Sequence, residues 1–301
     1  MRDAVKIAVK KAICFECKLP DSNRGIDKSC LSNTNDMCFS NKHPNDIATI
    51  IYNGIVEFAV NEYKIDYNAL EQEQRRTILR RIRYDPSAPT PQKLKYGFFG
   101  EVLIDLLLRC FMNTEVLLAR GYFYSVLERG EPKGFDVFHL IDHKNYLDLW
   151  LGEAKFYINY KKPITEVLGK LELSLSDEYI NRNLIALIDK ENDFSHNSPK
   201  LQAILDAWEE RPGINLGQEM TRYNIRLTYP IFIAYQKTAS DAYHDSISKC
   251  IDHIASEFRR INIKISASYN YRLFFIFLPL AEVMKIKERV IEWIDMQEPL
   301  I

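Results

Sequence analysis

Glycine is scarce in this chain of 301 residues, with only 11 copies, and no low-complexity tract is present. Both facts disfavour a disordered protein and a nucleotide-binding protein built around glycine-rich phosphate loops. The formal net charge is only −1, because 40 lysines and arginines nearly balance 41 aspartates and glutamates. This balance argues against a histone-like binder of polyanions, so any nucleic-acid surface must be a local patch.

Long apolar runs are also missing. The longest, around residues 273–278, has the length of a strand and is far below the ~20 residues that a membrane span requires. Lysines at positions 6, 10 and 11 interrupt the N-terminal stretch, where a signal peptide needs a continuous apolar core. We therefore expect a cytoplasmic protein that does not bind membranes.

Cysteine is infrequent but unevenly placed. Of the six cysteines, four lie within the first forty residues, at Cys14, Cys17, Cys30 and Cys38. Because no export signal is visible, disulfides are disfavoured and a Zn²⁺ site is the sharper alternative. The second pair lacks the tight C-x2-C spacing of a four-cysteine zinc site. Reduced cysteines in a small loop-rich appendage are the other interpretation.

The chain divides into three parts. Residues 1–43 form the polar, cysteine-bearing appendage, and residues 44–95 a helical segment that ends in a proline-rich linker. A helix over about 67–83 in that segment is rich in arginine (Arg75, Arg76, Arg80, Arg81 and Arg83). It fits contacts to phosphates, although a solvated charged face or a protein interface explains it about as well.

The third part, residues 96–301, alternates helices and strands. Its pattern predicts a helix from residue 96, then strands over 116–127, 135–141 and 147–157, with a hairpin turn at 142–145. A helix over 163–188, a strand over 225–235, a helix over 241–260, a strand near 273–277 and an amphipathic helix from 283 follow. This order predicts an α/β fold, in which a mixed sheet is flanked by helices.

Two of these strands carry charges in an apolar setting. Asp136 follows Gly134 on one strand, while Glu153 and Lys155 lie two residues apart on the next, and so share a face. Charges on such a face are costly unless they are paired or bound. Because oxygen ligands suit Mg²⁺, we expect Asp136 and Glu153 to bind the metal and Lys155 to activate or orient the attacking water in phosphodiester cleavage.

The main alternative for this set is a surface ion pair, which is what a bare Glu-x-Lys usually forms. Three observations favour the site. The flanking residues are apolar on both faces, which indicates a central strand. Gly134 and Gly152 allow a close approach of backbone or substrate, and Asp136 lies on the partner strand of a hairpin.

Glu101 is the fourth candidate. It follows Gly100 on the helix that precedes the strands, amid apolar residues. An acid at this position can reach the same metal directly or through water. A solvated or capping helix residue is an equally good interpretation.

At these residues the sequence resembles the restriction-endonuclease-like PD-(D/E)xK superfamily. Asp136, Glu153 and Lys155 match its signature, and Glu101 matches the acid often found on the upstream helix. Phe135 stands where the superfamily often has proline, a position that is not a metal ligand. The resemblance implies an αβββαβ core with helical additions at both ends, and makes residues 96–301 the nuclease domain.

A narrower resemblance is to the HamA family of Hachiman anti-phage systems, over roughly residues 45–297. It rests on the segments Gly100-Glu101-Val102-Leu103-Ile104-Asp105-Leu106-Leu107, Lys133-Gly134-Phe135-Asp136 and Leu149-Trp150-Leu151-Gly152-Glu153-Ala154-Lys155-Phe156-Tyr157. The resemblance implies a Mg²⁺-dependent DNase, with Mn²⁺ as a possible substitute. It also implies a partner helicase, HamB, that restrains the nuclease until activation leads to DNA degradation. The competing class is a catalytically silent subunit that binds DNA or regulates a helicase.

Overall fold

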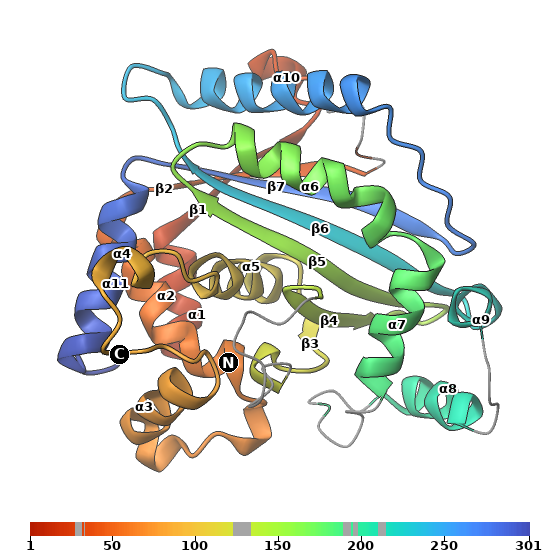
Figure 1. Ribbon diagram of the computed structural model, residues 1–301, viewed down its shortest axis with the longest axis horizontal. Helices are drawn as coiled ribbons and strands as arrows, with labels where there is room; N and C mark the ends of the chain where they lie inside the picture. The colour runs from red at the N-terminus through yellow and green to blue at the C-terminus, as the bar shows by residue number, and fades with distance from the viewer. Residues whose placement is uncertain (28–31, 33, 123–133, 189–193, 195–197, 210–214) are drawn as a thin grey trace.

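The computed structural model describes residues 1–301 except 28–31, 33, 123–133, 189–193, 195–197 and 210–214 (Figure 1). Its helices are α1 (Asp3–Ala12), α2 (Pro44–Ala59), α3 (Leu70–Arg80), α4 (Thr90–Lys93), α5 (Phe98–Phe111), α6 (Lys161–Ser174), α7 (Asp177–Ile188), α8 (Pro199–Glu209), α9 (Leu216–Arg222), α10 (Tyr243–Ile261) and α11 (Val283–Met296). Short 3-10 helices are η1 (Ser22–Arg24), η2 (Glu62–Lys64), η3 (Tyr67–Ala69) and η4 (Arg120–Tyr122).

The strands are β1 (Ile13–Leu19), β2 (Asp36–Asn41), β3 (Glu115–Val116), β4 (Val137–Asp142), β5 (Leu147–Tyr157), β6 (Ile225–Gln236) and β7 (Tyr271–Leu280). Within the described residues they form one sheet in the order β1-β2-β7-β6-β5-β4-β3. Neighbours from β2 to β5 along this order run parallel, and the pairs at both ends run antiparallel. The predicted α/β fold with a mixed sheet is confirmed, and α5-β3-β4-β5-α6-β6 follows the expected αβββαβ order, with α7, α8 and α9 inserted between α6 and β6.

Helices cover both faces of the sheet because its central strands are apolar on both sides. On β5, Leu149 and Leu151 belong to one buried cluster, together with residues of α6, α7, α8 and α10. Trp150, between them, belongs to another, together with residues of α1, α2, α5 and α11. Figure 1 shows α6 and α10 above the sheet, and α2 and α5 below it. The sheet therefore separates two apolar cores.

The prediction of a strand over 116–127 is wrong for most of the residues in this range that the structure describes. β3 ends at Val116, and residues 117–119 are irregular before the 3-10 turn η4. The amides of Leu117 and Leu118 both donate to the carbonyl of Phe138 on β4, at 2.9 and 3.5 Å, and the amide of Ala119 then donates to Oδ1 of Asn61 instead, at 2.9 Å. Residues 123–127 lie outside the described part of the chain.

The expected helix over 163–188 is two helices. α6 ends at Ser174 and α7 begins at Asp177. The hydroxyl of Ser176 accepts a hydrogen bond from the amide of Tyr179 at 3.2 Å. This side chain therefore satisfies a free amide at the start of α7, as a helix cap does, and apolar periodicity does not reveal such a break.

The cysteine-bearing N-terminal part contributes two strands to the sheet. β1 pairs with β2, and β2 pairs with β7. The boundary expected at residue 43 therefore falls between β2 and α2, and the division into three parts stays a hypothesis. Within the described residues, none of the helices is long and apolar enough to cross a membrane.

Candidate active site on the β4–β5 hairpin

Strand β5 carries Glu153 and Lys155 on one face. Nζ of Lys155 lies 3.5 Å from Oε2 of Glu153, and the side chains are 19 % and 17 % exposed, respectively. β5 lies between β4 and β6, so the prediction of a central strand is confirmed. The pair is thus more than a solvated surface contact, because both charges have lost most of their water.

Gly152 allows β5 to approach β6 closely. A Cβ atom at this position would lie 2.2 Å from the carbonyl oxygen of Pro230 and 2.5 Å from its Cγ atom. Proline lacks the amide hydrogen that a central strand needs, so the ladder is interrupted here. Glu153 follows directly after this point, so the close contact of Gly152 with Pro230 fixes the backbone from which Glu153 extends.

Asp136 lies next to the Glu153–Lys155 pair because its backbone extends the hairpin by one residue beyond β4. Its amide donates to the carbonyl of Gly152 at 2.8 Å, and its Oδ2 atom accepts from the amide of Ala154 at 2.8 Å. Gly134 enters this turn with φ of 147°, where a side chain is disfavoured. The strand expected over 135–141 thus begins at Val137, and Asp136 lies just before it, bonded to β5.

Glu101 reaches the same neighbourhood from the opposite face of the sheet. It is buried in the first turn of α5. The preceding Gly100 lets α5 pack onto β5, since a Cβ atom there would lie 3.1 Å from that of Phe156. The solvated alternative for Glu101 is therefore wrong, because the side chain is only 6 % exposed.

Arg120 connects Glu101 to Asp136. Its Nε atom lies 3.5 Å from Oε2 of Glu101 and its Nη2 atom 3.7 Å from Oδ1 of Asp136. The arginine side chain is 3 % exposed. Sequence reasoning missed this residue because it assigned residues 116–127 to a strand; an arginine within the apolar stretch around Leu117, Leu118 and Ala119 was the available signal.

The pKa values in the site reflect its burial. Burial raises the pKa of Glu153, and Asp136 adds to that shift while Lys155 opposes it. Burial by itself lowers the pKa of Lys155, but Glu153 and Asp136 outweigh it, so the pKa is raised. Burial also raises the pKa values of Tyr179 and Tyr229, with Glu153 as the next contributor. The charge of Glu153 therefore acts on both tyrosines, and the raised pKa of Lys155 keeps it protonated at neutral pH.

The donor set suits a hard divalent cation. Asp136 and Glu153 offer carboxylate oxygens, and Oε2 of Glu153 is buried without a normal hydrogen bond to any described residue. Among the described residues, no three His, Cys, Asp or Glu side chains are placed to hold a metal ion. Mg²⁺ does not need such a closed cage, because it binds through one or two carboxylates and keeps water or substrate phosphates as further ligands.

The sequence as a whole matches the HamA family model over residues 8–294. The chain belongs to the HamA family. This confirms the resemblance seen in the motifs, and extends it from residues 45–297 to include β1 and β2. Membership indicates a protein of Hachiman anti-phage defence. Neither a curated protein nor a solved structure matches the chain.

In this HamA family member the N-terminal cysteines lie on the sheet. Cys17 on β1 stands opposite Cys38 on β2, and both are buried. Burial raises the pKa of both thiols, and protonated thiols are poor metal ligands. Cys14 is half-buried, and Cys30 lies outside the described residues, so zinc binding stays a prediction.

The arginine-rich helix lies near the site. Arg75, Arg76 and Arg80 on α3 are exposed, and the guanidinium of Arg81, just after it, lies 4.4 Å from the ring centre of Tyr122 in η4. Arg81, the residue after α3, therefore contacts the short turn that carries Arg120. Phosphate contacts by α3 stay a prediction.

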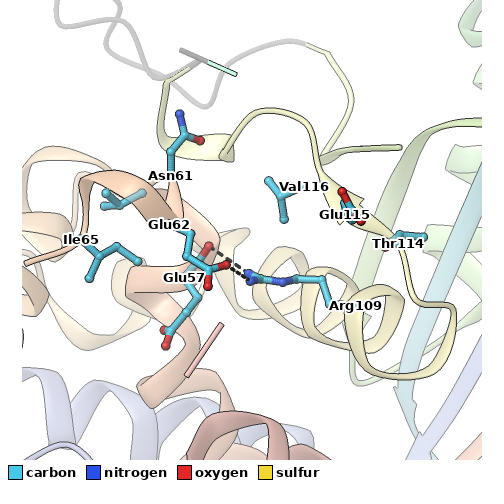
Figure 2. Close-up of a pocket in the computed structure, with 9 residues that line it drawn as sticks. Glu57, Asn61, Glu62, Ile65, Arg109, Thr114, Glu115 and Val116 are labelled. Atoms are coloured by element: carbon cyan, nitrogen blue, oxygen red, sulfur yellow. Dashed lines mark hydrogen bonds and ion pairs between the residues drawn. The ribbon is translucent and has the colours of Figure 1, made fainter. Parts of the chain in front are cut away.

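A cavity of about 230 Å³ lies elsewhere, between the C-terminal ends of α2 and α5. Figure 2 shows Arg109 extending from α5 across it. Its guanidinium donates to a carboxylate oxygen of Glu62 at 3.2 Å and to the carbonyl of Glu57 at 3.3 Å. Since the protein itself satisfies this arginine, the cavity gives no independent indication of a substrate.

Proposed function

We propose that this HamA family member is a Mg²⁺-dependent deoxyribonuclease of Hachiman defence, which a partner helicase of the HamB type restrains until activation. The observation that carries the proposal is the β4–β5 hairpin, which holds the Asp136 carboxylate beside the Glu153–Lys155 pair. Three ionisable groups, two on β5 and one directly before β4, lie together in a partly buried site. The family match supports the defence role.

Each side chain has a chemical task in this proposal. A bound Mg²⁺, or Mn²⁺ in its place, supplies a Lewis acid for the phosphate and lowers the pKa of a coordinated water. Asp136 and Glu153 would hold the cation, with Glu101 assisting. Lys155 orients the attacking water and balances negative charge through its ammonium group. Its raised pKa makes it a donor of hydrogen bonds rather than a base.

Substitution of the paired residues tests the proposal. We expect Glu153→Ala and Lys155→Ala each to lower the rate of DNA cleavage at least ~100-fold, the scale of a lost catalytic group. The measurement is degradation of linear and circular DNA in Mg²⁺, by the chain alone and with its helicase and nucleotide. The folded state of each variant is checked by its melting curve.

A matched control is the exposed pair Lys162 and Glu166 on α6, whose charged atoms lie 3.8 Å apart. Lys162→Ala and Glu166→Ala remove the same residue types without touching the hairpin, and cleavage should persist. Normal DNA degradation by both the Glu153 and the Lys155 variants would contradict the proposal. A wild-type chain that binds DNA or the helicase, but never cleaves in any metal, would favour the silent-subunit alternative.

A further inference from the structure

Arg120 places a positive charge between two of the carboxylates assigned to the metal. Its guanidinium lies 3.5 Å from Glu101 and 3.7 Å from Asp136. The other oxygen of Asp136, Oδ2, is bonded to the amide of Ala154. The oxygen of Asp136 that remains for a cation, Oδ1, is therefore the one that faces the guanidinium.

The backbone that carries Arg120 is held firmly by its neighbours. On one side of Arg120, the backbone amide of Ala119 donates to the side chain of Asn61. On the other side, a Cβ atom on Gly121 would lie 2.3 Å from the carbonyl oxygen of Ala59, so the turn fits closely against α2. Tyr122 packs its ring against the guanidinium of Arg81. The packing of this turn thus fixes the position from which the Arg120 side chain extends to the two carboxylates.

The distances from Arg120 to Glu101 and Asp136 make these ion pairs weaker than an ion pair of optimal geometry. Charge-assisted hydrogen bonds from guanidinium to carboxylate are ~2.7–2.9 Å long, whereas the contacts of Arg120 with Glu101 and with Asp136 are longer than this. Among the described residues, Arg120 lies between the carboxylates of Glu101 and Asp136, Lys155 pairs with Glu153, and the more distant Lys170 also acts on Glu153. A divalent cation at the same carboxylates would add two positive charges close to a buried arginine, and like charges repel strongly there.

We propose that Arg120 is a positioning residue that serves as the internal counter-ion of the metal-free site. It holds Asp136 and Glu101 in place and competes with the divalent cation for their oxygens. Loading of the metal therefore requires the guanidinium to withdraw from Asp136. This inference rests on the proposed function, because it concerns the same metal site.

The counter-ion role of Arg120 is tested by Mn²⁺ binding to the full chain without DNA. Binding is measured from the spin-resonance signal of free Mn²⁺. We expect Arg120→Met to bind Mn²⁺ about tenfold more tightly than wild type, the scale on which one neighbouring charge acts at a buried site. In the presence of a chelator, the melting temperature of Arg120→Met should be lower than that of wild type. Mn²⁺ should raise the melting temperature of this variant by more than it raises that of wild type. A purely structural arginine predicts the loss of stability without tighter binding.

Arg109→Met is the matched control. Arg109 also extends from a buried position to two carboxylates, 3.2 Å from Glu62 and 3.6 Å from Asp105, neither of which is assigned to the metal. Its replacement should leave Mn²⁺ affinity unchanged. Should Arg120→Met fail to fold, Arg120→Lys provides the test: the shorter ammonium cannot bridge both acids, and we expect several-fold tighter binding.

The outcomes separate the inference from the proposed function. Asp136→Asn defines the site, since its loss of Mn²⁺ binding identifies the ion bound at Asp136. If wild type shows this Asp136-dependent binding and neither Arg120 variant binds more tightly, the counter-ion role is overturned while the metal site stands. If no variant binds Mn²⁺ in an Asp136-dependent manner, the metal site and the counter-ion role fall together.

Discussion

Gly152 is the residue on which the local geometry of the site depends most directly. The strand continues through it to Glu153, and its carbonyl accepts the amide of Asp136. Its Cα faces Pro230 on β6 at a distance that leaves no space for a side chain. The contact involves backbone atoms of a central strand, which cannot move aside as a flexible side chain does. A methyl group here must therefore shift the strands.

We expect Gly152→Ala to lower the free energy of unfolding by about 2–4 kcal/mol, the cost of forcing atoms into a packed interior. Cleavage should fall as well, because Glu153 and Asp136 are displaced. Gly169→Ala on α6 is the control: nothing lies within 4 Å of its added Cβ atom, and alanine favours the helix by ~1 kcal/mol. Denaturant unfolding measures both. Equal stability of the two variants would show that the contact with Pro230 is unimportant.

The neighbourhood of Asp136, Glu153 and Lys155 was accessible to sequence reasoning, since side chains alternate along a strand and a tight hairpin brings its two strands together. Arg120 was not accessible in the same way. It lies sixteen positions before Asp136, and its approach depends on the fit of Gly121 against α2. No local pattern encodes that fit.

At the scale of elements, a buried chain of polar groups ties α5 to β4. Nε2 of His139 lies 2.8 Å from Oδ1 of Asp105, and Nδ1 lies 2.7 Å from the hydroxyl of Thr114. All three side chains are buried. α5 also carries Glu101 and β4 follows Asp136, so this connection fixes the two elements that supply acids to the site.

His139→Leu should therefore lower the free energy of unfolding by about 2–4 kcal/mol, since it leaves the Asp105 carboxylate buried without its main partner. Thr114→Val removes one hydrogen bond at the end of the chain and should cost ~1 kcal/mol. Urea titrations of the two variants measure the difference. A histidine variant as stable as the threonine variant would indicate that the Asp105 contact contributes little.

The elements themselves followed from the sequence to differing degrees. The hairpin of β4 and β5, the strands β6 and β7 and the amphipathic α11 were confirmed because apolar periodicity and turn residues specify them locally. The break between α6 and α7 and the end of β3 were not foreseen. In both cases a polar side chain, Ser176 or Asn61, takes over a backbone amide.

For the whole molecule, the position of β1 and β2 matters most (Figure 1). Phe39 on β2 is fully buried in the same cluster as α2, α5 and α11, with its ring centre 5.0 Å from that of Phe111 on α5. A core shared in this way links the N-terminal strands to the helix that carries Glu101. It predicts that the chain unfolds as one unit.

We expect Phe39→Ala to cost about 3–5 kcal/mol and to shift a single melting transition of the entire chain. Phe15 is the control, because it pairs with Phe39 across β1 and β2 yet is 47 % exposed; Phe15→Ala should cost much less. Calorimetry of both variants is the measurement. Two separate transitions, with only one shifted by the Phe39 substitution, would instead support an appendage that ends at residue 43.

The alternation of strands, the hairpin that joins Asp136 to Glu153 and Lys155, and the family itself can be read from the linear order of residues. These properties depend on neighbours a few positions apart or on short motifs. The membership of β1 and β2 in the sheet, the contact of Gly152 with Pro230 and the place of Arg120 between two acids cannot be read in this way. They arise from packing between segments distant in the chain, where complementary shape and the burial of charge select one arrangement.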